Sequence, residues 1–319
     1  MGTTWSVSRD QTLQTCERRY YFQYLAPARA NSRDETLREI ALLKKLKNIP
    51  MWQGELFHSL VAEYLQNARR RTPYRPLALL EKVKARIKRE WEASANTLIR
   101  PNTRSVDNGD SVTLFEHEYG ELPAGIDYIE VTHRVEELFW RFVAWADDKE
   151  LVQSVQQAKN VWIEPQMFGP QAPGFEIDSV KVLMKVDLAM LSCDGQFEIF
   201  DWKTGIPPLH PTGAMSNAEF QVTVYQLWPH LAFHRPIDAI QAHLVYVGAD
   251  PISQQTFGID QNALAYTLSL VRRSIAHILS YDSGYQNAEL RIDEFDFAAI
   301  SSTCEKCSFK RLCQRTLEI

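Results

Sequence analysis

The sequence has no apolar run near the ~18 residues needed to cross a membrane, and its N-terminus lacks the apolar core of a secretory signal peptide. It has no phosphate-binding loop of the form Gly-x-x-x-x-Gly-Lys-Ser/Thr, and nothing suggests a flavin or nicotinamide site. The chain also has no net positive charge: its formal net charge is −5. A nucleic-acid partner would therefore need a local basic patch. Five cysteines without an export signal indicate the reducing cytosol, so we expect a cytoplasmic protein that meets no membrane.

The composition allows a large folded core, with 45% hydrophobic and 24% charged residues among 319. A first helix is expected from Ser8, with Ser8 and Gln11 as a capping box and Cys16, Tyr20 and Tyr24 on one face. Further helices are expected at 31–49, from Gly54, and at 128–160, 217–233 and 261–280, and strands at 161–164, 180–191, 197–203 and 240–247. Strands flanked by helices predict an α/β fold with a mixed central sheet. We expect a single domain with N-terminal helices (1–65), a mostly helical insertion (66–158), a core (159–290) and a C-terminal cysteine motif (291–319).

The segment Phe197-Glu198-Ile199-Phe200-Asp201-Trp202-Lys203 carries the candidate chemistry. Residues two apart on a strand share a face, so Asp201 and Lys203 point the same way. A carboxylate beside an ammonium can hold a divalent cation while the amine orients a water, which is what metal-assisted phosphodiester hydrolysis needs. Carboxylate and carbonyl oxygens suit Mg²⁺ or Mn²⁺. Alone, Asp-x-Lys is more often an exposed ion pair.

Asp187 lies in the preceding apolar segment, where an unpartnered carboxylate would be costly. Asp194-Gly195 predicts a hairpin between the two segments. A two-residue turn would place Asp187 opposite Trp202, on the wrong face, whereas a three-residue turn or bulge places it opposite Asp201. We predict the second register.

Two helices offer further polar groups. His58 flanks an apolar helical stripe and could give an imidazole to the metal, although a lone histidine there is more often a satisfied core residue. Gln221 and Tyr225 lie four residues apart on one helical face and could hydrogen-bond to site groups or to a phosphate.

Three cysteines, Cys304, Cys307 and Cys313, fall within ten residues, and Cys16 is a remote fourth. Such spacing indicates a metal centre. Zinc sites usually have two paired ligand knuckles, and the second pair is missing, so a [4Fe–4S] cluster joining the N- and C-terminal regions is the better interpretation. Cys16 packed among tyrosines is the alternative, and Cys193 is expected to be a plain thiol.

A basic stretch runs over 69–89 and includes Lys82, Lys84, Arg86 and Lys88. These residues would contact phosphate, as would four cations near the cysteines, Lys306, Lys310, Arg311 and Arg315. The alternative is that 82–89 is a solvated helix face.

The ordered set Cys16, Gly54-x-x-Phe57-His58, Asp187, Asp201-Trp202-Lys203, Gln221-x-x-x-Tyr225 and Cys304/Cys307/Cys313 resembles RecB-like PD-(D/E)xK nucleases of the iron–sulfur branch. That branch includes nuclease modules of bacterial recombination helicase–nucleases and CRISPR-associated adaptation exonucleases. The resemblance implies a restriction-endonuclease-like fold. It also implies the following roles: His58, Asp187, Asp201 and the Trp202 carbonyl as metal ligands, Lys203 as the catalytic lysine, Gln221 and Tyr225 as supporting residues, the four cysteines as cluster ligands, and Glu164 as an acidic position on the first core strand. Met184 departs from the glycine that the family usually has three residues before the first aspartate.

The expected function is therefore metal-dependent cleavage of DNA, with single-stranded DNA or free ends favoured by the resemblance, in repair, recombination or defence. Because the sequence has no phosphate-binding loop, duplex unwinding would need a separate helicase as partner. A non-catalytic DNA-binding or scaffold module with a structural cluster is the alternative, and an electron-transfer protein is a third interpretation.

Overall fold

The structure is a computed structural model that describes residues 3–27, 32–72, 75–97, 112–165, 173–208, 215–287 and 290–317. The chain divides into two compact units. Unit 1 comprises Met1–Val7, Gln53–Lys84 and Thr132–Ile275, and unit 2 comprises Ser8–Trp52, Ala85–Val131 and Ala276–Ile319. No helix within the described ranges is long and apolar enough to span a membrane.

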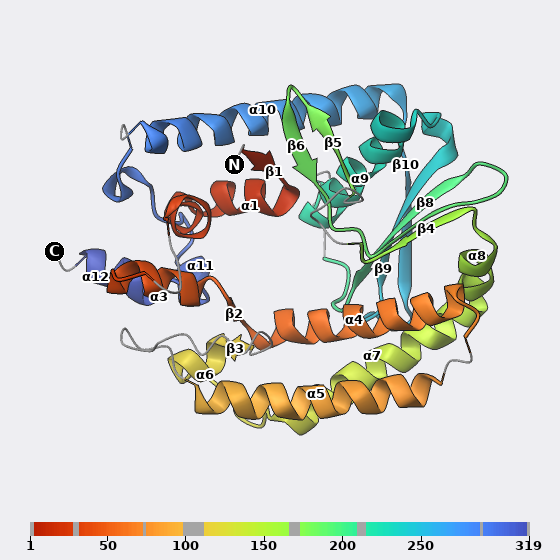
Figure 1. Ribbon diagram of the computed structural model, residues 1–319, viewed down its shortest axis with the longest axis horizontal. Helices are drawn as coiled ribbons and strands as arrows, with labels where there is room; N and C mark the ends of the chain where they lie inside the picture. Colours follow the sequence, from red (N-terminus) through yellow and green to blue (C-terminus); the bar gives the residue numbers. More distant parts are fainter. Residues whose placement is uncertain are drawn as a thin grey trace. The chain divides into compact units, whose positions relative to one another are not determined.

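A five-stranded sheet with the strand order β10-β9-β8-β7-β4 forms the centre of unit 1 (Figure 1). Its strands are β4 (Asn160–Ile163), β7 (Leu188–Leu191), β8 (Phe197–Lys203), β9 (Ile240–Tyr246) and β10 (Ser253–Gly258). β8 pairs parallel with β9 and antiparallel with β7. The mixed sheet predicted from the sequence is therefore confirmed, with β8, the strand of Asp201 and Lys203, in its interior.

Alternation along β8 explains how helices cover both faces of this sheet. On one face, the Phe197 ring packs 5.6 Å from Trp228 of α9 (Asn217–Phe233), measured between ring centroids. On the other face, the Trp202 ring packs 5.1 Å from Phe142 of α7 (Tyr128–Asp148). Asp201 and Lys203 belong to the α9 face, since they alternate with Trp202.

The sequence pattern predicts one continuous strand over 180–191, and this prediction is wrong because the segment forms two strands in different sheets. β6 (Val180–Leu183) pairs with β1 (Thr4–Trp5) and β5 (Gly174–Ile177) in a separate three-stranded sheet, whereas β7 belongs to the five-stranded sheet. The intervening backbone bonds outside any ladder: the Lys185 carbonyl accepts from the Tyr225 hydroxyl at 2.8 Å, and the Asp187 carbonyl accepts from the Glu164 amide at 2.9 Å. These contacts satisfy the backbone of 184–187 in place of strand pairing, so Asp187 lies outside both ladders.

The other helices follow the sequence pattern with shifted ends. Helix α4 begins at Ile49 and runs to Arg69, rather than beginning at Gly54. The described part of 66–158 is mostly helical: the helices α5 (Pro76–Asn96), α6 (Phe115–Tyr119), α7 and α8 (Leu151–Gln157) are joined by loops and the short strand β3 (Thr113–Leu114). The long helix α10 spans Gln261–Gln286.

The helix expected from Ser8 through Tyr24 breaks at Cys16, and the predicted Ser8 capping box is wrong because α1 (Val7–Thr15) begins one residue earlier. Cys16 is extended, with φ −164°, and its sulfur accepts a hydrogen bond from the Arg19 amide as the N-cap of α2 (Glu17–Tyr20). A short π-helix, Tyr21–Leu25, follows. Because of this break, Cys16 and the tyrosines do not lie on one continuous helix.

Unit 2 brings its N-terminal helices and its C-terminal segment together. Phe22 stacks on Phe309 with ring centroids 5.1 Å apart, and the Arg18 amide donates to the Asp296 carbonyl at 3.1 Å. An apolar cluster built on these rings includes Leu43 of α3 (Glu35–Leu43) and Leu46 of β2 (Leu46–Lys47), together with Cys307 and Leu312. The last two belong to the segment with α11 (Ser301–Glu305) and α12 (Lys310–Leu317).

Candidate active site

The β7–β8 hairpin has the register that the metal-site hypothesis requires. Leu188 pairs with Phe200, which places Asp187 opposite Asp201. The Ser192 amide donates to the Gln196 carbonyl at 2.9 Å, so the turn holds three residues, and Gly195 supplies its positive φ of 96°. The predicted three-residue turn is confirmed, and both aspartates lie on one face.

Asp187 is buried and uses both carboxyl oxygens. Its Oδ1 lies 2.8 Å from Nδ1 of His58, and its Oδ2 accepts from the backbone amide of Trp202 at 2.8 Å. The two bonds fix the carboxylate between helix α4 and strand β8. This arrangement gives a buried charge the partners it needs.

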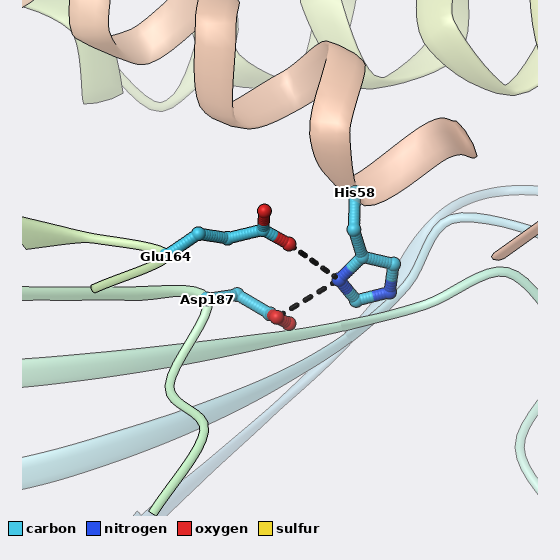
Figure 2. Close-up of side chains that lie close together, drawn as sticks. All are labelled: His58, Glu164 and Asp187. Atoms are coloured by element: carbon cyan, nitrogen blue, oxygen red, sulfur yellow. Dashed lines mark hydrogen bonds and ion pairs between the residues drawn. The ribbon is translucent and has the colours of Figure 1, made fainter. Parts of the chain in front are cut away.

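His58, Glu164 and Asp187 form the one group of the described residues in which three potential ligand atoms lie within 4.8 Å of one another. Figure 2 shows the carboxyl groups of Glu164 and Asp187 directed at the same ring nitrogen of His58, which Glu164 approaches to 3.9 Å. Glu164 has φ 36°, a strained value for a residue with a side chain. Strain of this kind concentrates at functional sites. The structure thus gives Glu164, known from the sequence only through a family resemblance, a definite place.

Asp201 is buried, and its Oδ2 lies 2.5 Å from Nζ of Lys203. The same oxygen accepts no hydrogen bond of normal geometry from the described residues, so the contact is an ion pair rather than a well-formed bond. A buried carboxylate oxygen without a directed donor leaves room for another positive ligand.

A chain of hydrogen bonds holds Lys203 from the other side. Its ammonium donates to the Gln221 side-chain oxygen at 3.0 Å, and the Gln221 amide donates to the Tyr225 hydroxyl at 2.7 Å. The Tyr225 hydroxyl in turn donates to the Lys185 carbonyl. Of the two predicted α9 residues, Gln221 therefore contacts the predicted lysine directly and Tyr225 supports it through Gln221. The Lys185 carbonyl is a member that sequence reasoning missed, and no sequence signal marks it.

His58, Glu164 and Asp201 all have raised pKa values. Burial raises the pKa of Asp201 strongly and the Asp187 charge raises it further, while the Lys203 ammonium opposes both. Burial and the Asp187 charge likewise raise the pKa of Glu164. Burial would lower the pKa of His58, but the charge and hydrogen bond of Asp187 outweigh it and raise that pKa. Without a cation, the clustered carboxylates repel one another.

The donor set fits a divalent cation. Carboxylate oxygens and one imidazole converge, an Asp201 oxygen lacks a directed donor, and burial together with the Asp187 charge raises the pKa values of Glu164 and Asp201. A hard divalent ion relieves all three conditions.

The loop after β8 depends on a glycine that sequence reasoning missed. A side chain at Gly248 would overlap the carbonyl oxygens of Thr204 and Gly205, directly after Lys203. The signal was available, because an isolated glycine at a strand end often marks close backbone approach.

All four predicted cluster cysteines, Cys16, Cys304, Cys307 and Cys313, line one cavity of about 660 Å³ in unit 2. Burial, followed by the charges of neighbouring thiols, raises the pKa of Cys313 to about 12. Among the described residues, no three cysteine sulfurs lie within 4.8 Å of one another. Cys193 is exposed and does not line this cavity, and its thiol donates a hydrogen bond to the Gln157 carbonyl.

Six of the predicted phosphate-contacting cations are paired with glutamates, whereas Lys306 is exposed and forms no ion pair in the described part of the chain. The pairs are Lys82–Glu63 (2.8 Å), Lys84–Glu136 (3.0 Å), Arg86–Glu90 (2.6 Å) and Lys88–Glu92 (4.0 Å). Lys310 pairs with Glu121, and Arg311 pairs with Glu39 and Glu118. The side chain of Arg315 lies outside the described residues. Neutralised pairs favour the alternative of a solvated helix face at 82–89.

The comparisons with known proteins define the class. The chain belongs to the PD-(D/E)XK nuclease superfamily, whose family model matches residues 4–314. No curated protein sequence matches it significantly. Among solved structures, it is similar to a candidate exonuclease from Eubacterium rectale, with 14% identity, TM-score 0.48, and coverage of 97% of this chain and 87% of that one. It is also similar to the protein SSO0001, with 15% identity, TM-score 0.31, and coverage of 73% and 96%.

Proposed function

We propose that the protein is a Mg²⁺- or Mn²⁺-dependent deoxyribonuclease whose catalytic residues are Asp187, Asp201 and Lys203. One observation carries the proposal: the β7–β8 register sets the two aspartates opposite each other, and Lys203 contacts Asp201 on the same face. This is the arrangement that metal-assisted hydrolysis of a phosphodiester requires.

The ligand set that we propose is His58, Asp187, Asp201 and the Trp202 carbonyl, with Glu164 beside them. The carbonyl is supported by strand geometry. The Trp202 amide points to the Asp187 side, and the carbonyl of a strand residue points to the same neighbour as its amide. The β7 ladder ends at the Leu188–Phe200 pair, short of this carbonyl.

A bound divalent ion would supply Lewis acidity and stabilise the leaving 3′-oxygen. Lys203 would hold the attacking water in line with the phosphorus, because its ammonium is fixed between Asp201 and Gln221. Gln221 and Tyr225 act as positioning residues, since they reach the reaction through Lys203.

We also propose that Cys16, Cys304, Cys307 and Cys313 bind a [4Fe–4S] cluster. Their shared cavity supports this, and so does the electrostatic effect of the other three thiols on the pKa of Cys313. The cluster would join the N-terminal helices to the C-terminal segment within unit 2.

The finer substrate preference rests on the family resemblance. We propose single-stranded DNA or free DNA ends, cut by an exonuclease in repair, recombination or defence, with a separate helicase supplying unwinding. Lys82, Lys84, Arg86 and Lys88 stay candidate phosphate contacts; charge reversal of all four should lower DNA affinity and its salt dependence if they contact phosphate.

Anaerobic purification tests the two parts together. Iron and sulfide should co-purify, and the protein should degrade labelled DNA with Mn²⁺ but not with EDTA. The Asp201→Asn variant should keep its iron and lose cleavage. Equal cleavage by Asp201→Asn would contradict the active site, and a colourless protein containing zinc would contradict the cluster.

A further inference from the structure

A second cavity in unit 2, of about 560 Å³, is distinct from the cysteine cavity and takes no part in the proposed chemistry. We call it the cation cavity. Its wall includes three cations (Arg19, Lys44, Lys306), three aromatic rings (Tyr24, Phe115, Phe309), hydroxyl residues of α1 and of the cysteine segment, and Asn48 and Met51 at the start of α4. Its size is in the range of ligand sites, roughly 300–1,000 Å³.

The charge of this wall is one-sided. No carboxylate lines it, and Arg19, Lys44 and Lys306 form no ion pair within the described part of the chain. Lys310 and Arg311, by contrast, are paired with glutamates. In a chain of net charge −5, three unpaired cations around one cavity indicate that the neutralising anion comes from outside.

Lys44 makes this argument stronger because it is not a surface lysine. It is half-buried, and burial alone lowers its pKa. Holding a cation there without a partner costs free energy, which a bound anion would recover.

Tyr24 gives the cavity an aromatic wall. Its side chain is 36% exposed, although its ring is held by Tyr20, with centroids 5.1 Å apart, and by the Arg9 guanidinium, 5.0 Å from the Tyr24 centroid. A rigid, partly exposed ring beside unpaired cations and hydroxyls is the combination that binds single strands, because bases stack on the ring while cations follow the phosphates.

We propose that the cation cavity binds a phosphodiester and a stacked base of a single-stranded nucleic acid. The inference rests on the proposed function, since it gives the substrate strand of the nuclease a holding site in unit 2, whereas the metal-site residues belong to unit 1. Arg19 and Thr303 also line the cysteine cavity, so the test uses only residues that line the cation cavity alone.

The phosphate part is tested by Lys44→Gln/Lys306→Gln in the full chain. Affinity for a labelled single-stranded oligonucleotide is measured in EDTA, where no cleavage occurs, between 50 and 200 mM salt. Two lost phosphate contacts should reduce the slope of log affinity against log salt by about 1.4, so the wild type loses about 7-fold more affinity over this range than the variant. The charge-matched control Lys159→Gln/Arg273→Gln removes two exposed cations of unit 1 and should keep the wild-type slope.

The base part is tested at Tyr24. Tyr24→Leu should weaken binding by about 5-fold or more, the lower end of what one stacked base contributes, while Tyr24→Phe should bind as the wild type does. An abasic oligomer should bind Tyr24→Leu and wild type equally. A Tyr24→Leu variant that binds the normal oligonucleotide as tightly as wild type would overturn the stacked base.

The remaining outcomes separate this inference from the proposed nuclease. A wild-type slope in the double variant, or an equal loss in the control, would overturn the cation cavity as a strand site. If the double variant fails to fold, the exposed Lys306→Gln alone should reduce the slope by about 0.7. The cavity variants could lose affinity as expected while the wild type fails to cleave DNA in Mn²⁺. That result would support the cation cavity as a strand site and contradict the proposed nuclease activity.

Discussion

Replacing Asp187 should separate its structural role from its role as a metal ligand. Its carboxylate accepts from the Trp202 amide and contacts His58, each at 2.8 Å. Asp187→Asn keeps an oxygen for the Trp202 amide and removes a negative charge that raises the pKa of both Glu164 and Asp201. Asp187→Ala removes both contacts. The two variants should therefore differ in stability but agree in losing the metal.

The magnitudes follow from these contacts. Asp187→Ala leaves the Trp202 amide without a partner in a buried strand, at a cost of about 1–3 kcal/mol, and loses the His58 contact, worth about 1 kcal/mol. We expect a loss of about 2–4 kcal/mol in the free energy of unfolding in EDTA. Asp187→Asn should unfold at the wild-type denaturant concentration or above it.

Urea unfolding with and without Mn²⁺ measures both effects. At a Mn²⁺ concentration 100 times its dissociation constant, the wild type should gain about 2.7 kcal/mol. Neither Asp187 variant should gain from Mn²⁺. A Mn²⁺-dependent gain in Asp187→Asn equal to that of the wild type would refute the assignment of Asp187 as a ligand.

Three further predictions concern the supporting groups. Gln221→Leu removes the acceptor of the Lys203 ammonium, so kcat should fall by about 10-fold or more while Mn²⁺ affinity, measured by calorimetry, stays unchanged; a change in Mn²⁺ affinity alone would contradict a positioning role. The pKa values of His58 and Glu164 are raised, and that of Asp201 is raised to about 6. These ligands therefore keep their protons to higher pH, whereas metal ligands must be deprotonated. Mn²⁺ affinity should therefore increase as the pH rises through about 6, and a pH-independent affinity between 5 and 7 would count against this ligand set. Cys16→Ser should lose iron and lower the thermal stability of the chain, whereas Cys193→Ser, at an exposed thiol that does not line the cluster cavity, should retain the wild-type iron content; equal iron in both would remove Cys16 from the cluster.

The parts of the site that sequence predicted are those with a local cause. Alternation fixes which face Asp201 and Lys203 share, and the Asp194-Gly195 turn sets the register that brings Asp187 opposite Asp201. A four-residue spacing on one helix likewise placed Gln221 and Tyr225 together. Each of these follows from a few neighbouring residues.

The parts that sequence missed depend on distant contacts. An alternating pattern over 180–191 is equally compatible with one strand or two, and the break depends on the Tyr225 hydroxyl bound to the Lys185 carbonyl. The glutamates that pair with Lys82 and Lys84 come from helices α4 and α7, so part of the charge of this basic stretch is neutralised in the fold by residues distant in the sequence. The positive φ of Glu164 could not be predicted either, because positive φ is expected from glycine and not from a glutamate.

Single-turnover cleavage of labelled single-stranded DNA by Lys203→Ala tests the central claim most directly. With saturating Mn²⁺, and with Lys159→Ala as an exposed-lysine control, Lys203→Ala should cleave about 10²–10⁴-fold more slowly than the wild type while its Mn²⁺ affinity stays within a few fold. The control should match the wild type. Equal cleavage rates for Lys203→Ala and wild type would contradict a hydrolytic centre built from Asp187, Asp201 and Lys203.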